Sequence, residues 1–149
     1  MKTPIAIASD HAGYNLKETL KDDLCKNNYD IMDLGTNNIE PVDYTEFAFE
    51  MANLIELGKI KRGVLCCGTG IGVAIAANRF PEVRAANVHE SVGASFSRKH
   101  NDANVICFGQ RIVGQEVARN CLQVFLQTDF EGGRHLKRIE KLSKLNLKE

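Results

Sequence analysis

The sequence predicts an α/β fold: a Rossmann-like, doubly wound, five-stranded parallel sheet with helices on both faces and an extra C-terminal helix. Short apolar runs alternate five times with segments whose apolar residues recur at helical spacing. The connections are short, and right-handed crossovers then place neighbouring strands parallel. The chain has 149 residues, enough for one ordinary hydrophobic core. We therefore expect a single domain spanning residues 1–149.

The N-terminal half predicts two strand–helix units followed by a third strand. A short apolar run indicates a strand, and apolar residues at helical spacing indicate a helix. In chain order the segments are a strand at 3–9, a helix carrying Leu16, Leu20 and Leu24, a strand at 29–34, a polar loop at 35–43, a helix at 44–57 and a strand at 63–67. Gly58 is expected to end the second helix, because glycine is favoured just past a helix C-terminus.

The C-terminal half continues the alternation. A helix opens after the glycines that follow residue 67 and closes near "NRFPE". The next segments are a strand at 84–88, a helix at 90–99, a strand at 104–108, a helix at 114–126 and a final helix at 134–145. The final helix combines regularly spaced leucine and isoleucine with many lysines, which indicates one packed face and one solvated face. Its apolar face is available to pack on a neighbouring subunit.

Composition excludes several classes of partner. The 19 lysines and arginines balance 19 aspartates and glutamates, so no global field attracts nucleic acid or an anionic membrane. The N-terminal apolar run is too short for a signal peptide, and no segment is long enough to span a bilayer. The chain has five cysteines, an odd number that fits a reducing compartment. We expect a cytoplasmic protein with no nucleic-acid or membrane partner.

One edge of the predicted sheet collects polar side chains. Ligands of open α/β sheets bind outside the carboxyl ends of the strands. The residues directly after the strands are Asp10 and His11, then Cys67, Gly68, Thr69 and Gly70, then His89 and Glu90, and finally Gln110 and Arg111. This edge therefore combines an acid, an imidazole, a thiol, an amide-rich loop and a guanidinium. We interpret His89 as a surface or core residue.

The stretch "CCGTGIGV" runs from a strand through closely spaced glycines into a helix. Gly68, Gly70 and Gly72 permit positive-φ backbone and close approach of a ligand, and the helix start presents unpaired N–H groups. The loop suits an anionic group or a developing oxyanion, although a ligand-free turn is a simpler alternative. A dinucleotide site with Glu90 on a ribose is disfavoured, because the third glycine comes one residue early. A thiol phosphatase is excluded, since no arginine follows either cysteine at the required spacing.

The two adjacent cysteines have different predicted roles. Successive strand side chains point to opposite faces, so Cys66 is expected to pack under a helix. Cys67 ends the strand beside a helix start, where the dipole and local N–H groups stabilise a thiolate. Such a thiol can act as a general base or as a nucleophile. We interpret Cys25, Cys107 and Cys121 as small buried hydrophobic residues.

The remaining candidates are histidines and arginines. No two histidines have the spacing of a metal site, so no metal is expected. Arg134 and Arg138 lie four residues apart on one predicted helical face, directly after two glycines. This arrangement favours a fork that grips a phosphate or a carboxylate.

Six segments together resemble the type B ribose-5-phosphate isomerases, a family shared with the subunits of galactose-6-phosphate isomerase. They are "ASDHAGYNLK", "DLGT", "VDYTEFA", "CCGTGIGVAIAANR", "SRKHNDANVICFGQRIVG" and "FEGGRHLKRI". The resemblance runs in order over nearly the whole chain. It implies aldose–ketose isomerisation of a sugar phosphate through an enediolate, without a metal or an organic cofactor.

The resemblance also implies roles for individual residues. Cys67 would move a proton between C1 and C2, and the loop amides, helped by Thr69, would stabilise the developing oxyanion. His100, with Asp10 close by, would open the furanose ring. The implied substrate-binding residues are His11, Tyr44, Gly68, Gly70, Ile71, Gly72, Asn101, Arg111, Arg134, His135 and Arg138.

The same resemblance implies a homodimer or tetramer with shared active sites. His100, Asn101 and the final helix would lie across the interface from Cys67. The leading hypothesis is interconversion of ribose 5-phosphate and ribulose 5-phosphate. Isomerisation of a six-carbon sugar phosphate, such as galactose 6-phosphate or allose 6-phosphate, is the alternative. A dinucleotide-binding oxidoreductase is a more distant one.

Overall fold

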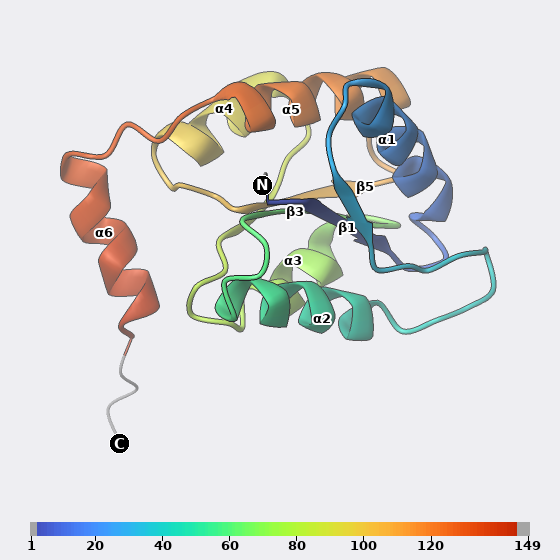
Figure 1. Cartoon of the computed structure of the whole chain (residues 1–149), viewed down its shortest axis with the longest axis horizontal. Coiled ribbons are helices and arrows are strands. Elements are labelled where there is room, and N and C mark those ends of the chain that lie inside the picture. The colour runs from blue at the N-terminus through green and yellow to red at the C-terminus, as the bar shows by residue number, and fades with distance from the viewer. Residues whose placement is uncertain (1–2, 146–149) are drawn as a thin grey trace.

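Five parallel strands form the centre of the computed structural model, which describes residues 3–145 (Figure 1). In chain order they are β1 (Ile5–Ser9), β2 (Ile31–Asp33), β3 (Arg62–Cys67), β4 (Ala85–Asn87) and β5 (Val105–Gly109). Their order across the sheet is β2-β1-β3-β5-β4. The chain passes from β1 outward to β2 on one side, and from β3 to the edge strand β4 on the other side, before β5 returns between β3 and β4. The carboxyl ends of β1 and β3 therefore flank the switch point at which such sheets bind ligands.

Helices cover both faces of the sheet, as predicted (Figure 1). The helices are α1 (Tyr14–Lys26), α2 (Tyr44–Glu56), α3 (Ile71–Ala77), α4 (Ser91–Lys99), α5 (Gln115–Gln127) and α6 (Arg134–Ser143). One core packs α1, α4 and α5 against the sheet, and a second core packs α2 and α3 against the opposite face. Cys66 belongs to the first core and Cys67 to the second, which confirms that the two side chains face opposite ways. Across residues 3–145, none of the helices has the length and apolar character needed to cross a bilayer.

The outer strands are shorter than the sequence predicts. β2 pairs only with β1 over three residues, and β4 pairs only with β5 over three residues. An edge strand has one hydrogen-bonded neighbour, so its ladder stops where that neighbour turns away. The central strands β1, β3 and β5 are almost fully buried and carry the apolar runs that made them recognisable.

Helix α6 stands apart from both layers, beside the amino ends of the strands (Figure 1). A hollow of about 660 Å³ is lined by the start of β4, the ends of α3 and α4, and Leu142 and Leu145. Leu136 and Leu142 are 47% and 58% exposed. The predicted amphipathic helix is therefore present, but within one chain much of its apolar surface stays uncovered.

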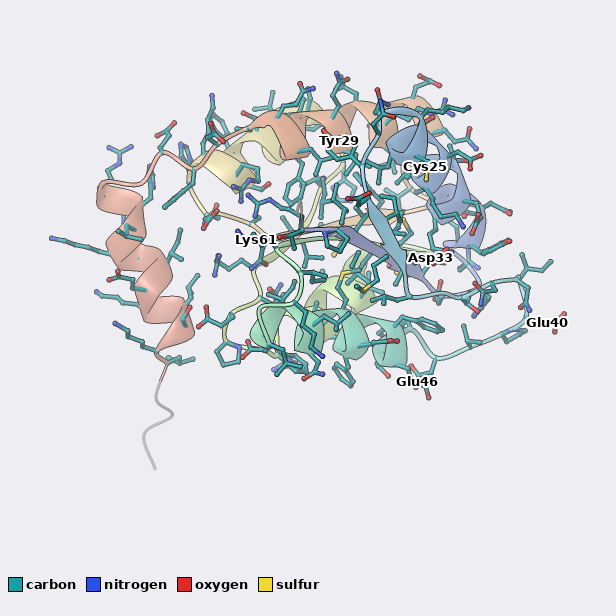
Figure 2. The ribbon with its side chains drawn as sticks, viewed as in Figure 1. Cys25, Tyr29, Asp33, Glu40, Glu46 and Lys61 are labelled. Carbon is teal, nitrogen blue, oxygen red and sulfur yellow. The ribbon has the colours of Figure 1, made fainter. Side chains whose placement is uncertain are left out.

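An ion-pair network ties α1 to the end of β2, where Asp33 lies (Figure 2). The side chain of Lys17 is fully buried, and its Nζ lies 2.9 Å from Asp33 Oδ1 and 2.9 Å from Glu18 Oε1. Lys21 Nζ lies 2.8 Å from Asp33 Oδ2. Burial alone would raise the pKa of Asp33, but hydrogen bonds from Lys21, the Gly35 N–H and Lys17 hold that pKa below its ordinary value.

Replacing Asp33 with asparagine should lower the free energy of unfolding by about 3 kcal/mol, because a buried ammonium loses a counter-charge. Denaturant unfolding at neutral pH measures this loss, with Asp30→Asn as the control at an exposed aspartate. The folded-state pKa of Asp33 is lowered, so its contribution is complete above the ordinary carboxyl pKa and disappears as pH falls through the lower folded value. The gap between wild type and variant should therefore narrow below about pH 4. Equal losses in both variants would contradict the role of the network.

Candidate active site

The glycine loop between β3 and α3 closes around the sulfur of Cys67. The Gly70 N–H donates a hydrogen bond to Cys67 Sγ at 3.0 Å. Cys67 is 5% exposed and packs among apolar residues on its inner side, so this polar contact marks the side of the sulfur that faces the loop. Helix α3 has only seven residues. The local N–H groups, rather than a long helix dipole, therefore provide most of the stabilisation available to a thiolate.

The three glycines of the loop serve different purposes. Among these three glycines, Gly70 alone adopts a positive φ, which is 77°. A Cβ on Gly70 would lie 2.9 Å from the carbonyl carbon of Phe108. A Cβ on Gly68 would lie 3.1 Å from Arg111 Nη1, and a Cβ on Gly72 would lie 2.8 Å from the ring of Tyr44. The loop is therefore bare of side chains where the guanidinium and the phenol ring approach it.

The end of β5 is bonded directly to this loop. The Arg111 N–H donates to Gly68 O at 3.0 Å, and the Gln110 N–H donates to Cys67 O at 2.9 Å. The hydroxyl of Thr69 accepts the Ile71 N–H at 3.2 Å and keeps its own proton available to donate. The thiol of Cys67, the hydroxyl of Thr69 and the guanidinium of Arg111 therefore lie in one region, at the ends of β3 and β5.

The carboxyl end of β1 supplies Asp10 and His11 on the other side of the switch point. Asp10 is buried, and its Oδ1 accepts the Gly13 N–H at 3.0 Å. His11 Nδ1 accepts the Val42 N–H at 3.1 Å, so the neutral imidazole carries its proton on Nε2, free to donate to a ligand. This contact brings the loop 35–43 against His11, while Glu40 lies at the loop's outer tip (Figure 2).

Asn87 at the end of β4 and Glu90 at the start of α4 have structural roles at the carboxyl edge of the sheet. The carboxylate of Glu90 caps α4, accepting the Val92 N–H at 2.7 Å and the Gly93 N–H at 2.6 Å. Glu90 is thus engaged as a helix cap, which weakens further the dinucleotide alternative. Sequence reasoning missed Asn87, whose Nδ2 lies 3.5 Å from Thr69 O and whose side chain faces Gly70. Its position as the last residue of a parallel strand was the available signal.

A second cluster lies at the opposite edge of the sheet. His100, Asn101, His135 and Arg138 line one hollow of about 440 Å³ together with two apolar residues of α6. The ring of His100 stacks on His135 with a centroid distance of 4.5 Å, and on Phe96 at 4.7 Å. Helix α4 returns the chain from the carboxyl edge to the start of β5, which places this cluster at the amino edge.

The environment of His135 is unusual for a histidine. The residue is 7% exposed, and its Nε2 has no hydrogen-bond partner in the described part of the chain. Burial, together with the nearby His100 and Arg134, lowers the pKa of His135 below its ordinary value. Of the two arginines predicted to form a fork, Arg138 lines the hollow, whereas Arg134 is exposed at the start of α6.

The predicted site residues therefore fall into two groups. One group, at the carboxyl edge, comprises Asp10, His11, Tyr44, Cys67, Gly68, Thr69, Gly70, Ile71, Gly72 and Arg111. The other, at the amino edge and on α6, comprises His100, Asn101, Arg134, His135 and Arg138. Asp10 and His100 were expected to be neighbours, and a single chain does not bring them together.

Comparison with known proteins identifies the family. The profile of the Ribose/Galactose Isomerase family matches residues 5–142. Ribose-5-phosphate isomerase B of Escherichia coli (strain K12) is 40% identical over 139 residues, covering 93% of each protein. The structure of Clostridium thermocellum ribose-5-phosphate isomerase B superimposes with a TM-score of 0.93 at 43% identity, covering 95% of both chains.

A further solved structure carries a ligand. Ribose-5-phosphate isomerase B of Mycoplasma genitalium with bound ribulose-5-phosphate has a TM-score of 0.92 and 38% identity, covering 97% of this chain and 96% of that one. The sequence profile, the relatives and the shared strand order agree. The chain belongs to the ribose/galactose isomerase family, among the type B ribose-5-phosphate isomerases, and is a sugar-phosphate isomerase.

Proposed function

We propose that the protein interconverts ribose 5-phosphate and ribulose 5-phosphate, with Cys67 as the base. The observation that carries this proposal is the Gly70 N–H bond to Cys67 Sγ at the switch point of the sheet. An N–H donor favours the charged thiolate over the neutral thiol. The bound ribulose-5-phosphate of the Mycoplasma genitalium relative supports a pentose phosphate as substrate.

The chemistry needs one proton to move between adjacent carbons. The thiolate of Cys67 takes the proton from C2 of the open-chain aldose, and the electron pair of that bond moves to form the C1–C2 double bond. The aldehyde oxygen becomes the negative oxygen of an enediolate, which the loop N–H groups and the Thr69 hydroxyl stabilise. The thiol then returns the proton to C1, while the proton of the C2 hydroxyl passes to the C1 oxygen, so that C2 becomes the ketone and C1 carries the hydroxyl group. No organic cofactor enters these steps.

We further propose that the active unit is at least a dimer with sites shared between subunits. In a single chain, the ring-opening residue His100 lies at the opposite sheet edge from Cys67. A second copy can supply the missing half through α6, whose exposed Leu136 and Leu142 would be covered by the association. The five free cysteines support a reducing, cytoplasmic setting.

The two half-sites divide the remaining roles. Asn101 of one copy and Tyr44 of the other would hold sugar hydroxyls. The phosphate would lie between His11 and Arg111 of one copy and His135, Arg134 and Arg138 of the other. Positive charge is thus concentrated at the site of a protein with zero net charge.

The direct test is to incubate the purified protein with ribose 5-phosphate and to follow ribulose 5-phosphate. Allose 6-phosphate and galactose 6-phosphate are assayed in parallel. We expect the pentose phosphate to have the highest kcat/KM. If only a hexose phosphate is turned over, the protein is a hexose-phosphate isomerase and the pentose assignment is wrong. If none of the three sugar phosphates is turned over, the proposed function is overturned.

Replacing Arg138 with alanine should raise KM by about tenfold to a hundredfold with little change in kcat, because a charge-assisted bond to the phosphate is lost equally in ground and transition states. Steady-state kinetics on ribose 5-phosphate measure both constants. Lys137→Ala is the matched control, since Lys137 is an exposed cation on the same helix that does not line the hollow. An unchanged KM in Arg138→Ala would contradict phosphate binding by this residue.

A further inference from the structure

We propose that His100, Glu131 and His135 form a binding site for a divalent first-row transition metal ion, of which Zn²⁺ is the representative, and that occupation of this site inhibits the isomerase. The metal site stands on the geometry of one chain. The inhibition rests on the proposed function, because it assumes that His100 and His135 serve the sugar phosphate.

The donor atoms are already gathered. A ring nitrogen of each histidine and a carboxylate oxygen of Glu131 all lie within 4.8 Å of one another. His135 Nε2 lies 3.7 Å from Glu131 Oε2. Zinc bonds to nitrogen and oxygen are about 2.0–2.2 Å long, so ligands around one ion are about 3–3.5 Å apart. The two rings are stacked at 15° to each other, so one imidazole must rotate out of the stack before the three donors close around an ion.

The backbone holds Glu131 in place beside the histidines. The Glu131 N–H donates to Lys99 O at 3.1 Å, which ties the segment before α6 to the end of α4 next to His100. Gly132 and Gly133 follow with positive φ values of 67° and 57°, and they turn the chain so that His135 comes back over His100. Residues far apart in the sequence are joined by this turn, which is why histidine spacing gave no sign of a metal site.

One donor lacks any partner. His135 Nε2 is buried and makes no hydrogen bond within the described residues, and the 3.7 Å to Glu131 exceeds hydrogen-bonding distance. A buried polar atom without a partner is costly, so it indicates a missing ligand at this position. A metal ion would bind that nitrogen through the lone pair of the neutral imidazole.

The donor set selects the class of ion. Two imidazoles and one carboxylate suit zinc, cobalt and nickel, whereas magnesium and calcium prefer oxygen ligands alone. Arg138 lines the same hollow and Arg134 lies close to His135, so positive charge opposes the ion and a single carboxylate offsets it. The expected site is therefore weaker than a structural zinc site.

An ion at this position withdraws two groups from the reaction. A metal-bound His100 has given its ring lone pair to the ion, so it can no longer accept a proton in ring opening, and a metal-bound His135 no longer faces the phosphate. Substrate phosphate and metal ion then compete for the same imidazole, so the inhibition should weaken as ribose 5-phosphate is raised.

The test measures binding and activity separately on metal-free protein. Zn²⁺ binding is followed by competition with a chromophoric chelator, and inhibition by the initial rate of ribose 5-phosphate isomerisation. Glu131→Gln should weaken Zn²⁺ binding by about tenfold or more, and it should raise the Zn²⁺ concentration needed for inhibition by a similar factor. Each inhibited rate is compared with the metal-free rate of the same variant. Glu140→Gln, which removes an exposed carboxylate from α6, should leave Zn²⁺ binding unchanged. Zn²⁺ binding should also persist in Cys67→Ala, which separates the site from the thiol.

Each outcome has a definite meaning. Absence of Zn²⁺ binding, or binding that Glu131→Gln leaves unchanged, overturns the metal site. Binding without inhibition overturns the inhibitory role alone. If ribose 5-phosphate is not turned over at all, the proposed function fails and the binding measurement still decides the site.

Discussion

Replacing Cys67 with alanine should reduce kcat for ribose 5-phosphate by about a thousandfold while the protein stays folded, because general base catalysis contributes about 10²–10⁴. The sulfur is the one basic group that the glycine loop holds by an N–H bond, at 3.0 Å from Gly70. KM should change little, since the proposed role of the thiol is at the reacting carbons and not at the phosphate. Steady-state kinetics, with circular dichroism to confirm folding, measure the effect.

The neighbouring cysteine offers a matched control. Cys66 is fully buried in the opposite core, and burial raises the pKa of its thiol, so it stays protonated at neutral pH. Cys66→Ala should keep kcat within a few-fold of wild type, at some cost in stability from the cavity. If Cys67→Ala stays folded with full activity, or if Cys66→Ala loses as much, the base has been misassigned.

The strand and helix layers of the fold could be predicted from the sequence because the spacing of its apolar residues is regular. The apolar runs of β1, β3 and β5 follow from burial on both faces, and the repeat of Leu16, Leu20 and Leu24 marks the buried side of α1. The ends of the edge strands were not readable. Their lengths depend on how far a single neighbour runs alongside, which is a property of the assembled sheet.

The candidate site was readable only at the carboxyl edge. The rule that parallel strands end together is enough to gather Asp10, Cys67 and Arg111 without any structure. No such rule joins His100 to His135, because their stacking depends on the turn of the chain between α5 and α6. His100, Asn101 and His135 came from the resemblance alone, whereas the spacing of Arg134 and Arg138 already indicated a fork for a phosphate or a carboxylate. The contact of Val42 with His11 likewise depends on the path of a loop that has no periodicity.

The separation of the two half-sites leads to a complementation experiment with a large expected effect. Cys67→Ala and His100→Ala proteins should each be nearly inactive, and a mixture that exchanges subunits should recover about a quarter of wild-type activity. Random pairing makes about half of the dimers mixed, and each mixed dimer has one site with an intact thiol from one chain and an intact imidazole from the other. Subunits are exchanged by unfolding and refolding the variants together, and the rate is compared with the variants refolded alone.

A second mixture controls for recovery that has nothing to do with shared sites. Cys67 and Arg111 lie at the same sheet edge, joined through the bond from the Arg111 N–H to Gly68 O. Every site of a Cys67→Ala and Arg111→Ala dimer therefore carries one defect, and this mixture should not regain activity. The two mixtures differ only in the sheet edge at which the second substitution lies. Recovery in both would therefore indicate that mixing stabilises the variant proteins, and not that the sites are shared. Recovery in neither, with mixed dimers demonstrated by differential tags, would show that each chain builds its site alone, and the separation of His100 from Cys67 would then exclude His100 as the ring-opening group.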